Sequence, residues 1–83
     1  MRLREHDLVL KEIDGETVLL DLVSSTYFSA NRTGTFLLGL LGEEQETEAL
    51  VAALAQEFGL DDQAARVDTD AFVALLAEQR LLA

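Results

Sequence analysis

The sequence has no cysteine, few basic residues and no long apolar run. Without cysteine the chain can form neither a disulfide framework nor the usual structural zinc site, and it has no thiol nucleophile. Its apolar stretches fall well short of the roughly 18 residues that span a bilayer. The first ten residues, MRLREHDLVL, lack the apolar core of a secretory signal. These absences predict a cytoplasmic protein with no membrane partner.

Basic residues are scarce enough to argue against a nucleic-acid partner. The chain has 6 Lys and Arg against 16 Asp and Glu, which gives a formal net charge of −10. Duplex binding depends on Lys and Arg side chains that displace counterions from phosphates, so this charge opposes it. The acidic excess has two remaining interpretations, namely ordinary solubility or the steering of a basic partner towards an acidic face.

Residues that could carry out catalysis are also missing. His6 is the only histidine, and Ser24, Ser25 and Ser29 have no credible His/Asp arrangement around them. The glycines match no phosphate-binding fingerprint. No Asp-Ser-Leu attachment site opens a helix, which argues against an acyl or peptidyl carrier. We therefore expect no enzymatic activity, no metal and no cofactor.

What the sequence does contain is a short β-rich segment in a chain of single-domain size. The 83 residues, 49% of them hydrophobic, suffice for one small domain spanning residues 1–83. Leu8–Ile13 and Thr17–Leu22 predict two strands joined by Asp14-Gly15, a type I′ turn signal in which both central residues need φ > 0. Thr26–Ala30 predicts a third strand that completes an antiparallel meander. We expect this strand at a sheet edge, where its unpaired backbone groups must be covered, blunted or given to a partner.

Three helices are expected after the strands. Asn31 is placed to cap the first helix, and Gly42 to end it in a left-handed conformation. Thr47 is placed to cap the second helix, which Gly59 ends, and Asp61 opens the third. The predicted fold class is therefore α+β, a three-stranded antiparallel sheet followed by three helices. The expected helical spans are Arg32–Leu41, Glu48–Phe58 and Asp61–Arg80.

The third predicted helix has two apolar faces. At about 100° per residue, one side holds the residues expected in the core, which are Ala65, Phe72, Leu75 and Leu76. A second shoulder of Val67, Ala71 and Ala74 lies between Asp70 and Glu78. This shoulder is either ordinary helix packing or one wall of a shallow groove beside the third strand. Such a groove suits an extended peptide, because the strand gives backbone hydrogen bonds and the helix gives side-chain pockets.

The order of elements and three segments of the sequence resemble the PqqD-like proteins, the precursor-peptide recognition elements of ribosomally made, modified peptides. The segments are DGETVLLDL, STYFSAN and the closing DAFVALLAEQRLLA. The family has an aromatic third strand that runs into Leu-Asn and then Thr-Gly or Thr-Ala at the start of a helix. Ala30 stands where Leu is usual. The matching residues here are Tyr27, Phe28, Asn31, Thr33 and Gly34.

The resemblance implies a winged helix-turn-helix fold that has lost nucleic-acid binding. Members capture the leader segment of a precursor peptide as an added antiparallel strand. A free-standing chain of this length is most similar to the recognition protein of lasso-peptide pathways, which works beside a papain- or transglutaminase-like leader peptidase and a cyclase. A PqqD-type chaperone that serves a radical-SAM enzyme is the alternative within the family. A winged-helix DNA-binding regulator fits the same topology but is disfavoured by the net charge of −10.

The resemblance and the helix pattern together predict where the leader binds. The third strand would pair with it, and the small-residue shoulder of the third helix would supply pockets. Asp70 or Glu78 could pair with a basic leader residue. The predicted contact residues are Thr26, Tyr27, Phe28, Ser29 and Ala30 on the strand, and Val67, Asp70, Ala71, Ala74 and Glu78 on the helix.

Overall fold

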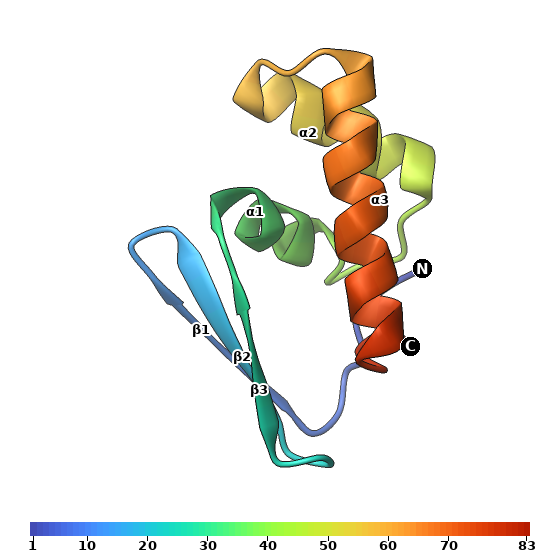
Figure 1. Cartoon of the computed structure of the whole chain (residues 1–83). Helices are drawn as coiled ribbons and strands as arrows, with labels where there is room; N and C mark the ends of the chain where they lie inside the picture. Colours follow the sequence, from blue (N-terminus) through green and yellow to red (C-terminus); the bar gives the residue numbers. More distant parts are fainter.

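The computed structural model describes all 83 residues and confirms the predicted α+β architecture. The three strands form one antiparallel sheet in the order β1-β2-β3, and the three helices follow it in the chain (Figure 1). No helix combines the length and apolarity that a membrane crossing requires. The elements are β1 (Leu8–Ile13), β2 (Glu16–Asp21), β3 (Thr26–Ala30), α1 (Arg32–Leu40), α2 (Thr47–Phe58) and α3 (Asp62–Glu78).

A tight turn joins β1 to β2. Asp14 and Gly15 have φ of 54° and 81°, as the predicted turn requires. Pairing begins directly after the turn with Ile13 opposite Glu16, so β2 starts one residue earlier than predicted. It also ends one residue earlier, at Asp21, although the N–H of Leu22 still donates in register to the carbonyl of Asp7 at 2.9 Å.

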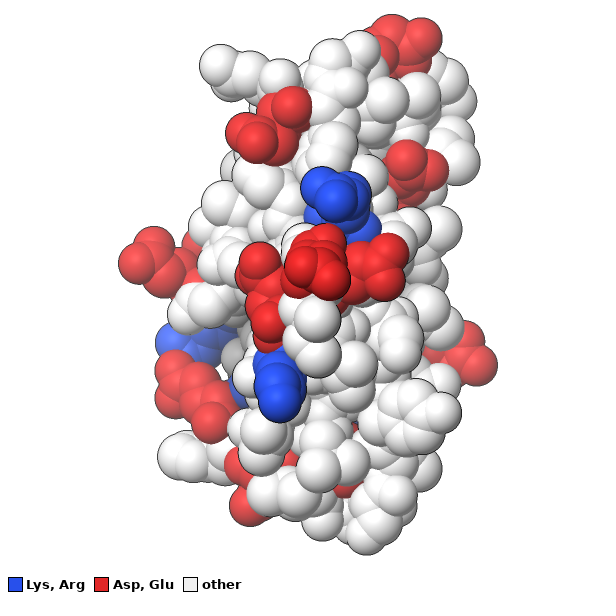
Figure 2. Space-filling model, turned by 90° about the vertical axis from the view of Figure 1, so that its left-hand side faces the viewer, with Lys and Arg blue, Asp and Glu red and all other residues white.

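The two faces of the sheet have different surroundings. On β2 the residues Thr17, Leu19 and Asp21 are buried against the rest of the protein. On the opposite face an apolar row crosses all three strands, made of Val9, Leu20 and Tyr27, which are 50%, 39% and 75% exposed. Figure 2, seen from the β1–β2 side, shows acidic residues spread over the surface, few basic residues, and white areas between them. The sheet therefore leaves an apolar face open to solvent.

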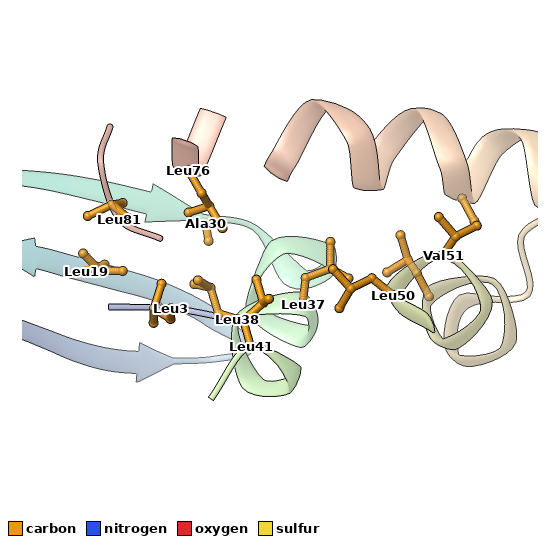
Figure 3. Close-up of a cluster of buried hydrophobic side chains, with 12 residues drawn as sticks. Leu3, Leu19, Ala30, Leu37, Leu38, Leu41, Leu50, Val51, Leu76 and Leu81 are labelled. Carbon is orange, nitrogen blue, oxygen red and sulfur yellow. The ribbon is translucent and has the colours of Figure 1, made fainter. Parts of the chain in front are cut away.

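The core runs from the inner face of the sheet through α1 into the space between α2 and α3 (Figure 3). The two ends of the chain pack against this core and against each other. The N–H of Leu3 donates to the carbonyl of Leu41 at 2.8 Å, and Leu3 forms an isolated bridge with Leu82. The fully buried side chains are mostly leucines, namely Leu19, Leu37, Leu41, Leu50, Leu54, Leu76 and Leu81.

Three of the predicted helix ends are confirmed. The side chain of Asn31 accepts a hydrogen bond from the N–H of Gly34 at 3.0 Å and caps α1. Asp61 caps α3 in the same way through the N–H of Ala64 at 2.7 Å. Gly59 ends α2 in the left-handed region, with φ of 64°. The side chains of Asn31 and Asp61 thus satisfy helix N–H groups that have no partner within the helix.

Two other predictions at helix ends are wrong. Gly42 is not a left-handed cap, because α1 ends at Leu40 and the cap residue Leu41 keeps a φ of −76°. Thr47 does not cap α2, because it is already the first helical residue. The cap position belongs to Glu46, whose backbone carbonyl accepts from the N–H groups of the first turn and whose side chain makes no capping bond. The last carbonyl of α1, that of Leu40, accepts from the N–H of Glu43 at 3.3 Å and from Nε2 of Gln45 at 3.1 Å.

The core face of α3 differs from its prediction at one residue. Ala65 and Leu76 are fully buried and Phe72 is half-buried, but Leu75 is 41% exposed, so its assignment to the core is wrong. Thr69 is fully buried in its place. It stands four residues after Ala65 and seven before Leu76, on the same side of the helix. The helix is thus rotated so that Leu75 faces the open space beside β3.

Candidate functional site

β3 has one side without a strand partner. It pairs with β2 from Thr17 opposite Ala30 to Asp21 opposite Thr26, and it is the last strand of the sheet. In an antiparallel ladder alternate residues direct their N–H and C=O groups away from the paired neighbour. The five residues TYFSA include no charge and no proline that would blunt the edge. The edge predicted from the sequence is therefore present and unprotected.

Two aromatic rings connect β3 to α3 beside this edge. The ring centroids of Phe28 and Phe72 lie 6.0 Å apart at 61°, an edge-to-face arrangement. Phe72 also lies against α1. A Cβ atom at Gly34 would stand 2.8 Å from Cε1 of Phe72 and 3.1 Å from the Cβ of Ala30. Glycine at position 34 therefore allows the close approach that holds the aromatic pair in place.

An open cavity of about 250 Å³ lies between the start of α1 and α3. Ala71, Phe72 and Leu75 form its apolar side. Its polar side consists of Asn31, Thr33 and Asp68. We call this cavity, together with the open edge of Thr26–Ala30 and the Phe28–Phe72 pair, the β3–α3 groove. In Figure 1, β3 is the strand nearest α3.

A smaller recess marks the other end of the β3–α3 groove. Thr26, Tyr27 and Phe28 line it with Gln79 and Leu81 from the end of the chain. No three His, Asp or Glu side chains gather anywhere in the protein as a metal site would require. The groove offers backbone hydrogen-bonding groups, aromatic surface and two carboxylates, Asp68 in the cavity and the ion-paired Asp21 at the recess, which suits the binding of an extended peptide.

The predicted strand residues all lie along the open edge, and their side chains alternate between the two faces of the sheet. Thr26, Phe28 and Ala30 stand opposite buried residues of β2 and so point towards the helices. Tyr27 and Ser29 stand opposite exposed residues and point to the open face. The structure thereby fixes which side chains can enter the groove.

Most of the predicted contact residues on α3 do not face the groove. Only Ala71 lines the cavity. Val67, Asp70 and Ala74 are exposed and lie two or five positions from Phe72, which at about 100° per residue puts them on the opposite side of α3.

The remaining lining residues of α3 were not in the predicted site. Glu78 is exposed and does not line the cavity, whereas Asp68 and Leu75 do. The sequence carried a signal for them, since they stand four residues before and three residues after Phe72 and so share its face.

An ion pair below the groove ties the first residues of the chain to β2 and to the end of α3. Nη2 of Arg4 lies 2.6 Å from Oδ1 of Asp21, and its Nη1 donates to the carbonyl of Arg80 at 2.9 Å. The N–H of Val23 donates to the same carboxylate at 3.0 Å. The hydrogen bond from Arg4 lowers the pKa of Asp21 below its ordinary value of 3.8, and this outweighs the burial that would raise it.

Acid should weaken the fold through this pair. A carboxyl group whose pKa is lowered by folding stabilises the folded state above its unfolded pKa, and that stabilisation is lost as the pH falls through the folded pKa. We expect the free energy of unfolding, measured with urea, to decline below about pH 5. Asp21→Asn should flatten this decline in part, since Arg66 lowers the pKa of Glu48 as well. Asp70→Asn, which removes an exposed carboxylate without an ion pair, is the matched control and should leave the decline unchanged.

Comparison with known proteins agrees with this geometry. Residues 16–82 match the family model described as coenzyme PQQ synthesis protein D (PqqD). No curated protein sequence gives a significant match. Among solved structures, TbiB1 in complex with the TbiA(beta) leader peptide is 33% identical, with 99% of this chain and 94% of that chain covered and a TM-score of 0.85. A lasso peptide synthetase B1 complexed with the leader peptide is 26% identical, with 96% and 93% covered and a TM-score of 0.80. The family model and these two similarities, each spanning most of the chain, show that the protein belongs to the PqqD family.

Proposed function

We propose that residues 1–83 form a recognition domain that binds the leader segment of a precursor peptide in lasso-peptide biosynthesis. One observation carries the proposal: β3 has an uncharged, unpaired edge directly beside the cavity and aromatic pair of the β3–α3 groove. Two similar proteins are described as leader-peptide complexes, which supports the same ligand class here.

The leader binds as a fourth strand antiparallel to β3. Its backbone pairs with the N–H and C=O groups that β3 leaves free, which fixes its register but reads little of its sequence. Every second leader side chain faces the helices beside Thr26, Phe28 and Ala30, and these side chains are the ones that the groove discriminates. Antiparallel pairing puts the N-terminal end of the bound segment next to Ala30 and its C-terminal end next to Thr26.

The other leader side chains remain visible on the open face of the sheet. They extend the exposed row of Val9, Leu20 and Tyr27, so an enzyme that docks on this face contacts protein and leader together. We propose that a papain- or transglutaminase-like leader peptidase, and then a cyclase, receive the precursor in this way. The domain itself is a non-catalytic binding protein.

A PqqD-type chaperone that serves a radical-SAM enzyme is the second candidate, favoured by the description of the matching family model. It uses the same groove, so the two candidates differ in the enzyme that takes over the leader. Pull-down with each purified enzyme in the presence of leader separates them. Retention of the peptidase alone supports the lasso pathway, and retention of the radical-SAM enzyme alone supports the second candidate.

Titration with the leader peptide of a candidate precursor tests the proposed binding mode. We expect amide chemical shifts in ¹H–¹⁵N spectra to change along Thr26–Ala30 and Asp68–Leu75, with slower hydrogen exchange at alternate β3 residues. A scrambled leader is the control and should leave the spectrum unchanged. Absence of binding, or shifts confined to α2 and the open sheet face, would contradict strand addition to β3.

A further inference from the structure

The cavity of the β3–α3 groove contains a single charged side chain, and that side chain has no partner. Asp68 lines the cavity and takes part in none of the ion pairs of the protein. The amide oxygen of Asn31 is already occupied, since it accepts from Oγ1 of Thr33 and from the N–H of Gly34, each at 3.0 Å. The Asp68 carboxylate is therefore the one anionic acceptor that the cavity offers to a ligand.

None of the basic residues of the chain lies where it could neutralise Asp68. Arg66, two positions away, is bound to Glu48 at 2.7 Å and lies 3.5 Å from Asp62. The guanidinium of Arg32 lies over the β1–β2 turn, 3.5 Å from the Cβ position of Gly15. Two of the other basic residues already have acidic partners, since Arg2 pairs with Glu5 and Arg4 with Asp21. The last two lie on other parts of the chain, Lys11 on β1 and Arg80 after the end of α3. With a net charge of −10 on the protein, the complementary charge has to come from the ligand.

We propose that this cavity receives a lysine or arginine side chain of the leader. The inference rests on the proposed function. Phe72 and Leu75 suit the methylene stem of such a side chain, and Asp68 accepts hydrogen bonds from its charged head. A neutral apolar side chain would fill the same space but would leave the carboxylate, which is exposed at the mouth of the cavity, without a partner.

Strand geometry predicts which position of the bound leader the basic residue occupies. Directly opposed residues of paired strands point to the same face, so the leader residue opposite Ala30 points towards the helices and the cavity. The next leader residue on that face stands two positions later, opposite Phe28, where the Phe28–Phe72 pair selects an apolar side chain. The groove therefore selects a leader segment with a basic residue, then any residue and then an apolar residue, counted from the N-terminal end of the leader.

Selection from a library of random dodecapeptides, displayed on mRNA, tests the proposal without knowledge of the natural leader. The library is selected in parallel on the wild-type protein and on the variants Asp68→Asn, Asp68→Lys and Asp70→Asn. On the wild type we expect enrichment of the basic–any–apolar pattern. Asp68→Asn should lose the basic preference and keep the apolar one, and Asp68→Lys should replace the basic residue by Asp or Glu. Asp70→Asn makes the same charge change on the opposite side of α3 and should select as the wild type does.

A selected lysine peptide then gives the energetic test. Asp68→Asn should weaken its binding by about five-fold, as expected for an ion pair with partial exposure. The variant of that peptide with methionine for lysine should bind both proteins equally. Peptides that compete with each other at β3 but show no basic preference would overturn this inference alone. Loss of the preference in Asp70→Asn but not in Asp68→Asn would also overturn it. Failure to enrich any peptide that shifts the β3 amides would instead contradict the proposed function.

Discussion

Replacing Ala71 by phenylalanine should remove most of the leader binding and leave the fold intact. Ala71 is exposed on α3 and lines the cavity, with Phe72 and Leu75 on either side. A ring at this position fills the space that the leader side chains need. We expect the dissociation constant, measured by calorimetry, to rise about thirty-fold or more, which corresponds to ~2 kcal/mol.

Ala74→Phe is the matched control for this experiment. Ala74 is also exposed in the middle of α3 but lies on the side away from Phe72. Both substitutions replace alanine in a helix and therefore share the same propensity cost of about 0.5 kcal/mol. Thermal unfolding should shift equally in the two variants, whereas only Ala71→Phe should lose affinity. Equal affinities of the two variants for the leader would show that the leader does not enter the space beside Ala71.

Gly34→Ala should damage both the stability and the groove. The new Cβ would stand 2.8 Å from Cε1 of Phe72, closer than atoms of this kind approach one another. The ring also packs edge-to-face against Phe28 with centroids 6.0 Å apart, so a shift of the ring disturbs the aromatic pair of the groove. We expect a loss of about 1–3 kcal/mol in the free energy of unfolding and a dissociation constant that is roughly ten-fold higher, or ~1.4 kcal/mol.

A second glycine of α1 provides a control in which the same substitution should stabilise the protein. Gly39 is exposed, and a Cβ there would meet no atom within 4 Å. Gly39→Ala should therefore stabilise the protein by about 1 kcal/mol through helix propensity and leave leader binding unchanged. In the double variant Gly34→Ala/Phe72→Leu the smaller side chain should relieve the contact, so the two changes should cost less together than their sum. Strictly additive costs, measured by denaturant unfolding, would mean that α1 does not position Phe72.

Local rules predicted most of the fold because they act within a few residues. The φ > 0 turn at Asp14-Gly15, the caps at Asn31 and Asp61 and the left-handed end at Gly59 all follow from the chemistry of the residue itself. The edge position of β3 followed from the small number of strands. The predictions at Gly42 and Thr47 failed because other groups serve those ends. The N–H of Glu43 and the side-chain amide of Gln45 satisfy the last carbonyl of α1, and the carbonyl of Glu46 accepts at the start of α2.

The groove-facing side of α3 could be predicted only in part. Ala71 lies beside the groove as predicted, but Leu75, predicted in the core, lines the cavity instead, and the polar Thr69 is fully buried. The direction in which a helix buries its side chains depends on which neighbours surround it, and α3 packs mainly on α2. The sequence showed Gly34 only as part of the family pattern, whereas its contact with Phe72 needs two elements distant along the chain.

Tyr27 is the only tyrosine of the protein, which has no tryptophan. The near-ultraviolet absorption and the fluorescence of the protein therefore come almost entirely from the phenol ring of Tyr27. That ring stands on the open face of the strand proposed to bind the leader. The unlabelled wild-type chain carries an optical probe at this edge. Quenching or enhancement of this emission reports events at β3 and nowhere else in the molecule, so stopped-flow mixing with a leader free of aromatic residues can follow association directly.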